Sequence, residues 1–225
     1  MSVKENAARI QQKIAAACER AGRNPQQVKV IAVTKYVSEE TAKAALEAGI
    51  RNIGENRDKG FLEKREALGD EAVWHFIGSL QSRKVKNIID HVDYLHSLDR
   101  LSLAKEIEKR ATNTVRCFIQ VNVSGEDSKH GLSPDEVVPF IEKLADFQKI
   151  QVVGLMTMAP YTDDREKVRS VFAGLRDLAE SVRSKKWGHA PCTELSMGMS
   201  NDFEIAVEEG ATFVRIGTAL VGKEF

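Results

Sequence analysis

The chain has 225 residues, and its 33 basic and 33 acidic side chains give a formal net charge of zero. A balanced charge leaves no broad positive surface for a phosphate backbone, so we expect no nucleic-acid partner. No apolar run approaches the ~20 residues that cross a bilayer, so we expect no membrane segment. Cys18, Cys117 and Cys192 are far apart and form no C-x-x-C pair, which favours reduced thiols in the cytoplasm and predicts no metal site.

Residues 1–22 predict a helix. Ser2 and Glu5 have the spacing of a capping box, apolar residues recur at helical spacing, and Gly22 can end the helix. The polar face mixes both signs of charge, which favours packing within the protein over binding to a membrane. The segment also lacks the continuous apolar stretch of a secretory signal.

Apolar, β-branched runs then alternate with amphipathic segments along the chain. The runs predict eight strands, at residues 28–34, 52–54, 73–78, 94–98, 115–123, 150–158, 194–197 and 213–217. Ser38 and Ser133 have the residue type that begins a helix. Eight strands alternating with helices, with no linker between them, predict a single-domain (β/α)8 TIM barrel over residues 1–225 with an extra N-terminal helix. A doubly wound sheet is the alternative, although its G-x-G-x-x-G turn is missing after the first strand.

Lys35 stands where the first predicted strand ends, in the stretch VKVIAVTKYV. In a barrel of this kind the ligand site lies at the carboxyl ends of the strands, so Lys35 falls at the mouth. Desolvation there lowers the pKa of a lysine towards the neutral, nucleophilic amine. The alternative is a lysine whose stem packs while its ammonium reaches solvent.

The last predicted strand contains Arg215 in the otherwise apolar run FVRIGTALVG. A buried guanidinium keeps its charge and needs an acceptor, which is either a carboxylate or a ligand atom. Gly217 and Thr218 offer close backbone approach and a hydroxyl group. In the preceding loop, SMGMSND, Ser196 and Ser200 offer further hydroxyls, and Ser200 is placed to cap the next helix. Loops after strands seven and eight are a common phosphate site in such barrels.

A phosphate site beside an amine is what pyridoxal 5′-phosphate needs. A lysine forms the Schiff base with its aldehyde, the phosphate-binding loops hold its phosphate, and an Asp or Arg faces the pyridine nitrogen. Here Arg215 would face the pyridine nitrogen. Because Arg stays protonated, it should leave the ring nitrogen unprotonated, which favours holding the cofactor or modest proton transfer over demanding carbanion chemistry.

Six segments in chain order resemble the pyridoxal phosphate homeostasis protein family. They are AVTK at 32–35, GEN at 54–56, WHFIGSLQSRKVKNI at 74–88, GLMTM at 154–158, LSMGMSNDFEIAVEEG at 195–210 and VRIGTALVG at 214–222. The resemblance covers nearly the whole chain. It implies a fold like the N-terminal barrel of alanine racemase, with Lys35 carrying the cofactor.

The same resemblance implies roles for further residues at the mouth. Ser196, Gly217 and Thr218 would hold the phosphate, with Ser200 nearby. Arg215 would face the pyridine nitrogen, and Asn56 would line the pocket. His75 and Gly78 also fall at the mouth, but His75 is interpreted as a core residue and not as a catalytic base. Lys129, in SGEDSKHG, could help to pass the cofactor by transimination, the alternative being a solvated loop lysine.

The choice between an enzyme and a holder depends on what faces Lys35. Alanine racemases add a C-terminal domain and need a second acid/base residue, usually a tyrosine, opposite the lysine. Here only ALVGKEF follows the last predicted strand, and none of Tyr36, Tyr94 and Tyr161 is obviously placed opposite Lys35. We therefore expect an open site and no catalytic residues.

The resemblance implies a cytoplasmic protein that holds, buffers or delivers pyridoxal phosphate in vitamin B6 and amino-acid homeostasis. PLP-dependent apoenzymes are its expected recipients. No long exposed apolar face is predicted, so we expect a monomer. The alternatives are a pyridoxal-dependent racemase of narrow activity and, less favoured, a Schiff-base aldolase built on Lys35.

Overall fold

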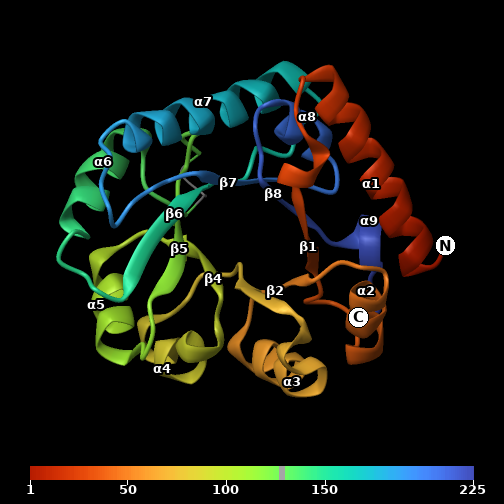
Figure 1. Cartoon of the computed structure of the whole chain (residues 1–225), viewed down its shortest axis with the longest axis horizontal. Helices are drawn as coiled ribbons and strands as arrows, with labels where there is room; N and C mark the ends of the chain where they lie inside the picture. Colours follow the sequence, from red (N-terminus) through yellow and green to blue (C-terminus); the bar gives the residue numbers. More distant parts are fainter. Residues whose placement is uncertain (127–129) are drawn as a thin grey trace.

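The computed structural model describes residues 1–126 and 130–225. Parallel strands follow one another around a closed barrel in chain order, and the last is hydrogen-bonded to the first (Figure 1). The strands are β1 (Lys29–Val33), β2 (Asn52–Glu55), β3 (Val73–Phe76), β4 (Tyr94–Leu98), β5 (Val115–Gln120), β6 (Ile150–Met156), β7 (Glu194–Met199) and β8 (Phe213–Ile216). The predicted (β/α)8 barrel is confirmed.

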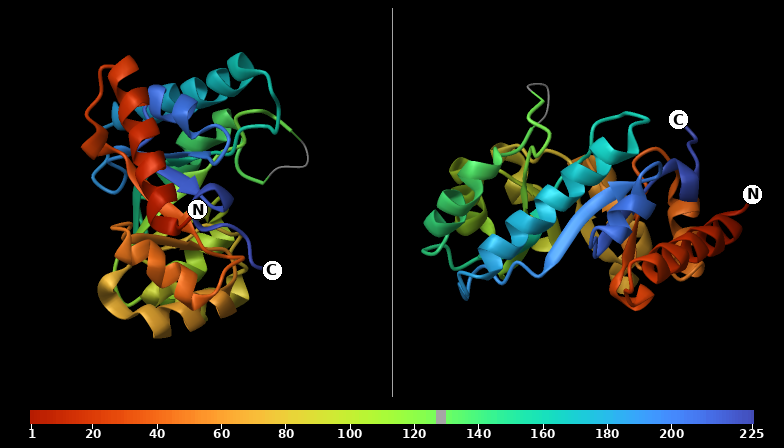
Figure 2. Two further views of the ribbon diagram at one scale, coloured as in Figure 1. Left: turned by 90° about the vertical axis from the view of Figure 1, so that its right-hand side faces the viewer. Right: turned by 90° about the horizontal axis from the view of Figure 1, so that it is seen from above.

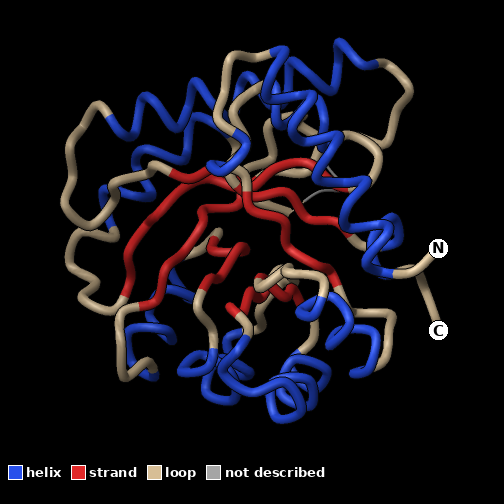
Figure 3. Tube along the Cα trace, turned by 45° about the vertical axis from the view of Figure 1, so that its right-hand side comes forward, coloured by secondary structure: helices blue, strands red, loops and turns tan. Residues whose placement is uncertain are grey.

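Helices surround the ring of strands, as Figure 3 shows. They are α1 (Val3–Arg20), α2 (Glu39–Glu47), α3 (Asp58–Leu68), α4 (Val85–Ile88), α5 (Leu101–Arg110), α6 (Pro134–Lys143), α7 (Arg165–Arg183), α8 (Phe203–Glu208) and α9 (Thr218–Val221). Within the described residues, none of these helices has both the length and the apolarity to cross a bilayer.

The N-terminal helix forms as predicted. Ser2 Oγ accepts the Glu5 N–H at 3.2 Å, and the Glu5 carboxylate accepts the Ser2 N–H at 2.8 Å, which completes the capping box. The helix ends at Arg20, and Gly22 follows with φ +64°, a left-handed conformation that favours glycine. Helix α1 packs against α8 and α9 along one side of the barrel, where its apolar stripe is buried (Figures 1 and 2).

Several strands end at positions different from those predicted. Strands β5 and β6 end at Gln120 and Met156, before the apolar runs do, and Val121 makes only an isolated bridge with Leu132. Strand β7 continues two residues beyond the predicted Met197, to Met199. Apolar runs record burial, and loops that pack over the mouth are buried as well, so the runs do not mark the end of hydrogen-bonded pairing.

The barrel has an apolar layer on each side of its strands. The larger one lies between the strands and the helices, and a smaller one fills the interior, with Ile31, Tyr94, Phe118, Val153, Met156 and Phe213. Polar side chains share that interior: the His75 ring stacks on Tyr94 at 4.7 Å, and the His96 ring stacks on Phe118 at 4.4 Å. Tyr94 and His96 alternate inward along one strand because its side-chain period is two.

Candidate cofactor site at the carboxyl edge of the barrel

Lys35 lies two residues beyond β1, at the carboxyl edge of the barrel as predicted. Strand β1 is paired with β2 on one side and with β8 on the other, so the ends of both strands flank Lys35. The side chain is half-buried, and its Nζ lies 4.9 Å from the centre of the Tyr36 ring. This cation–π contact leaves the amine at the mouth and not inside the barrel.

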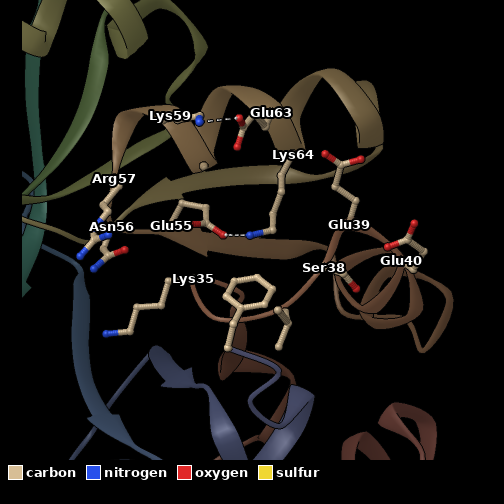
Figure 4. Close-up of a pocket in the computed structure, with 13 residues that line it drawn as sticks. Lys35, Ser38, Glu39, Glu40, Glu55, Asn56, Arg57, Lys59, Glu63 and Lys64 are labelled. Carbon is tan, nitrogen blue, oxygen red and sulfur yellow. Dashed lines mark hydrogen bonds and ion pairs between the residues drawn. The ribbon is translucent and has the colours of Figure 1, made fainter.

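A cavity of about 520 Å³ opens beside Lys35, between the ends of β1 and β2 and helices α2 and α3. Figure 4 shows Lys35 and Asn56 at one end of this cavity and Glu39 and Glu40 at the other. The backbone of Asn56 is contacted closely by the loop after β3. A Cβ atom on Gly78 would lie only 2.3 Å from the Asn56 carbonyl oxygen, so this approach requires glycine.

A buried ion pair stands in the middle of the cavity wall (Figure 4). Lys64 Nζ, on α3, donates to Glu55 Oε1 at 2.7 Å and to the Thr34 carbonyl at 2.8 Å. The Thr34 hydroxyl donates to the same carboxylate oxygen at 2.7 Å. Because Thr34 directly precedes Lys35, these bonds fix the backbone that carries the candidate Schiff-base lysine.

Arg215 lies inside the end of β8, in register with Ile31 of β1, and is 5% exposed. Its Nη1 donates to Ser196 Oγ at 2.6 Å and its Nη2 to the Thr157 carbonyl at 3.0 Å. Burial lowers the pKa of the guanidinium to about 10 while Asp202 acts in the opposite direction, so Arg215 remains charged at neutral pH. Among the described residues no carboxylate forms an ion pair with it, and its charge is met by neutral acceptors.

The two serines after β7 occupy different environments. Ser196 is fully buried, and its hydroxyl contacts both Arg215 and His96 Nδ1, the latter at 2.9 Å. Ser200 is half-buried in the loop. The prediction that Ser200 caps the next helix is wrong, because β7 runs further than expected and α8 begins only at Phe203, after Asp202.

Gly217 and Thr218 connect β8 to the short helix α9. Gly217 lies against the end of β1, where a Cβ atom on it would be 3.6 Å from Val33 Cβ, and Thr218 is exposed at the mouth. Since β7, β8 and β1 are neighbours, the ends that carry Ser200, Gly217 and Lys35 adjoin one another. The structure therefore brings the predicted amine and the predicted phosphate loops to one edge.

His75 is fully buried below the mouth, as its interpretation as a core residue predicted. Burial lowers its pKa to about 3, so the imidazole is neutral. It is bonded to His96 and to Asn52, a pairing across strands that the sequence did not reveal. Lys129 lies outside the described residues.

The tyrosines do not face Lys35 across a cavity. Tyr94 lies in the barrel interior, where its hydroxyl accepts a hydrogen bond from Arg116 at 2.8 Å, and Tyr161 is 98% exposed. Tyr36 lies beside the Lys35 amine in the same loop. In the part of the chain that the structure describes, no cluster of three or more His, Cys, Asp or Glu residues could hold a metal ion.

Comparison with known proteins places this chain in a family. The model of the alanine racemase N-terminal domain matches residues 6–224. A pyridoxal phosphate homeostasis protein of Aquifex aeolicus is 43% identical over 227 residues, which cover 99% of each chain. A second one, from Pseudomonas aeruginosa, is 38% identical over 98% of this chain and 95% of its own length.

Solved structures agree with this placement. PipY of Synechococcus elongatus, determined with PLP bound, is 32% identical and superposes with a TM-score of 0.82 over 95% of this chain and 100% of its own. Alanine racemase of Corynebacterium glutamicum shares the fold, at 18% identity and a TM-score of 0.78 over 99% of this chain and 61% of that one. The chain therefore belongs to the alanine racemase N-terminal domain family and, among its members, to the pyridoxal phosphate homeostasis proteins.

Proposed function

We propose that this protein binds pyridoxal 5′-phosphate at the carboxyl edge of the barrel and holds, buffers or delivers it without strong catalytic activity. The observation that carries the proposal is the buried Arg215, one strand away from Lys35 and without a described carboxylate partner. Such a guanidinium has donors left for an acceptor that takes no proton from it, as a pyridine nitrogen does. The name of the Aquifex relative and the PLP bound to PipY support this choice of ligand.

Under this proposal each group at the mouth has a separate task. Lys35 Nζ would be the amine that holds the cofactor through its aldehyde. Gly217, Thr218 and Ser200 hold the phosphate, and Asn56 lines the opposite wall. Bound pyridoxal phosphate supplies an electron-withdrawing ring, which Arg215 keeps weak by leaving the ring nitrogen unprotonated. The resemblance implies that Ser196 also holds the phosphate, but its hydroxyl already accepts a hydrogen bond from Arg215, so we propose that it positions Arg215 instead.

A holder fits the surroundings of Lys35 better than a racemase. Proton transfer on both faces of a cofactor needs a second acid/base residue across from the lysine. Tyr94 is below the site, Tyr161 points into solvent and Tyr36 is on the lysine's own loop. We also propose that the protein is a cytoplasmic monomer and passes PLP to PLP-dependent apoenzymes. Its three buried free thiols support a reducing location.

The test is the visible absorption spectrum of the protein with added PLP, before and after borohydride. The wild type should develop a band that bleaches on reduction and should gain mass on the Lys35 peptide, whereas Lys35→Ala should do neither. Lys59→Ala is the matched control, because Lys59 lines the same cavity but is exposed, and it should behave like the wild type. A colourless wild type with no added mass would overturn the proposal.

A second measurement separates holding from catalysis. Loaded protein should activate a PLP-dependent apoenzyme in solution while leaving the α-hydrogens of free amino acids unexchanged in deuterium oxide. Steady α-deuterium incorporation that depends on Lys35 would instead establish a racemase-type activity.

A further inference from the structure

Five polar side chains from five strands form a line across the barrel interior. Arg215 Nη1 lies 2.6 Å from Ser196 Oγ, which lies 2.9 Å from His96 Nδ1. His96 Nε2 lies 2.9 Å from His75 Nδ1, and His75 Nε2 lies 3.0 Å from Asn52 Oδ1. The four from Arg215 to His75 are buried, so each contact replaces one with water.

The chemistry of its first member gives this line a direction. Arg215 can only donate, so Ser196 Oγ accepts, and the single serine proton is left to donate to His96 Nδ1. A neutral His96 that accepts at Nδ1 carries its proton on Nε2 and donates to His75 Nδ1. His75 then carries its own proton on Nε2 and donates to the Asn52 carbonyl oxygen. Every contact pairs one donor with one acceptor.

The opposite direction satisfies fewer groups. Ser196 Oγ would accept from both Arg215 and His96, and its own proton would lack an acceptor among its described contacts. At the far end, His75 Nε2 would become an acceptor, and Asn52 would have to present its amide nitrogen there in place of the oxygen. A protonated imidazole is also disfavoured, since it would place a second charge beside Arg215 in a dry interior.

We propose that His96 and His75 are positioning residues that act on the cofactor through Arg215. The one-way chain holds the Ser196 hydroxyl as an acceptor, which fixes one edge of the guanidinium, while the Thr157 carbonyl fixes the other at the carboxyl end of β6. The remaining Arg215 donors are thereby held for the ligand. Because every other residue in this line is neutral, none of them cancels the positive charge of Arg215.

That the ligand is PLP rests on the proposed function. The direction of the hydrogen bonds from Arg215 to Asn52 does not. The first experiment therefore uses the protein without added ligand and records the nitrogen-15 shifts of its imidazoles by NMR at neutral pH. His75 and His96 should both be neutral and protonated on Nε2. His189 provides a reference, because its Nε2 faces the Ile141 carbonyl at 3.0 Å and must carry the proton there. A proton on Nδ1 of His96, or a positively charged imidazole, would contradict the proposed direction of these hydrogen bonds.

The second experiment measures the dissociation constant and the absorption maximum of bound PLP. Ser196→Ala and His96→Phe should weaken binding about tenfold and shift the maximum, as expected when a hydrogen bond to a charged group is lost. His96→Asn keeps an acceptor near the Nδ1 position and should recover much of the binding. His189→Gln should change neither quantity.

The outcomes separate the two claims. If the wild type binds PLP and both Ser196→Ala and His96→Phe leave its affinity and spectrum unchanged, the positioning role is wrong while the proposed function stands. Ser196→Ala removes one atom, so this comparison survives even if His96→Phe fails to fold. If the wild type binds no PLP, the proposed function fails and the positioning role fails with it, whatever the imidazole spectra show.

Discussion

Lys64 and Arg215 are both buried cations near the strand that leads to Lys35, yet their partners differ. Lys64 forms an ion pair with Glu55 at 2.7 Å, reinforced by the Thr34 hydroxyl on the same carboxylate oxygen. Arg215 contacts a serine hydroxyl and a backbone carbonyl, and behind the serine lies a chain of neutral imidazoles.

The difference separates a structural charge from a charge kept for a ligand. An ion pair cancels its own field and fixes the groups that form it, so Lys64 and Glu55 hold the backbone before Lys35. A guanidinium among neutral acceptors retains its field and some of its donors. For these two sites, the unmet hydrogen-bonding capacity of a buried cation is a better sign of ligand binding than burial alone.

The largest expected effect comes from breaking the ion pair. Lys64→Met leaves the Glu55 carboxylate buried without its ion-pair partner, with the Thr34 hydroxyl still donating to it, which should lower the free energy of unfolding by about 3–5 kcal/mol. Urea unfolding followed by circular dichroism measures the loss. The double variant Lys64→Met/Glu55→Gln should recover much of it, because the stranded charge is gone. A double variant as unstable as Lys64→Met would show that packing, and not charge, holds this wall.

Removing the second cation should affect the ligand more than the fold. Arg215→Gln retains an amide donor but loses the charge, so PLP should bind about ten- to a hundredfold more weakly, equivalent to roughly 1.5–3 kcal/mol for a hydrogen bond to a charged group. Titration of the visible band measures this. An unchanged dissociation constant would mean that the charge of Arg215, like that of Lys64, is structural and is not kept for the ligand.

The neutral chain beside Arg215 should make stability depend on pH. Burial lowers the pKa of His75 to about 3, against an unperturbed value near 6.5, with Arg116 and Lys29 acting in the same direction. Burial lowers the pKa of His96 as well, assisted by His75 and Arg215. Between pH 3 and pH 6.5 the unfolded state therefore binds more protons than the folded state. The stabilising contribution is complete above pH 6.5 and is lost as the pH falls towards 3.

For His75 the slope should approach about 1.4 kcal/mol per pH unit in that range, and the lowered pKa of His96 acts in the same direction. Urea unfolding of the wild type and of His75→Phe at pH 7, 6 and 5 measures it, and the variant should show the shallower dependence. Equal slopes would mean that His75 is protonated or exposed in the folded protein. Acidic side chains that titrate in the same range contribute equally to both proteins and cancel in the difference.

The sequence was sufficient for the barrel and for the positions of the two groups at its mouth. Most of the strands are local apolar runs. Lys35 stands out because it follows the end of such a run, and Arg215 because it interrupts one. What could not be predicted depends on partners distant in the chain: His96 and Ser196 are 100 residues apart. No local pattern reports such a pairing.

Two other features were inaccessible for related reasons. Glu55 ends a strand and Lys64 lies on the next helix, and only the packing of α3 on the barrel brings them into contact. The end of β7 depends on its pairing with β8 as far as Met199, which moved the start of α8 beyond Ser200. Both depend on how neighbouring elements are placed, which residue type and spacing do not specify.

The smallest expected effect comes from a second lysine on α3, and it tests whether burial decides the first prediction. Lys59 lines the same cavity as Lys64 and pairs with Glu63 at 3.7 Å, but both of its groups are exposed, with Lys59 86% accessible to solvent. An exposed i,i+4 pair contributes only about 0.2–0.5 kcal/mol because water screens it. Lys59→Met should therefore shift the urea midpoint far less than Lys64→Met, although both remove one ammonium from one helix. If both variants shift the urea midpoint by a similar amount, the destabilisation comes from the helix or from the loss of the lysine's aliphatic stem. The buried Glu55 carboxylate is then not its cause.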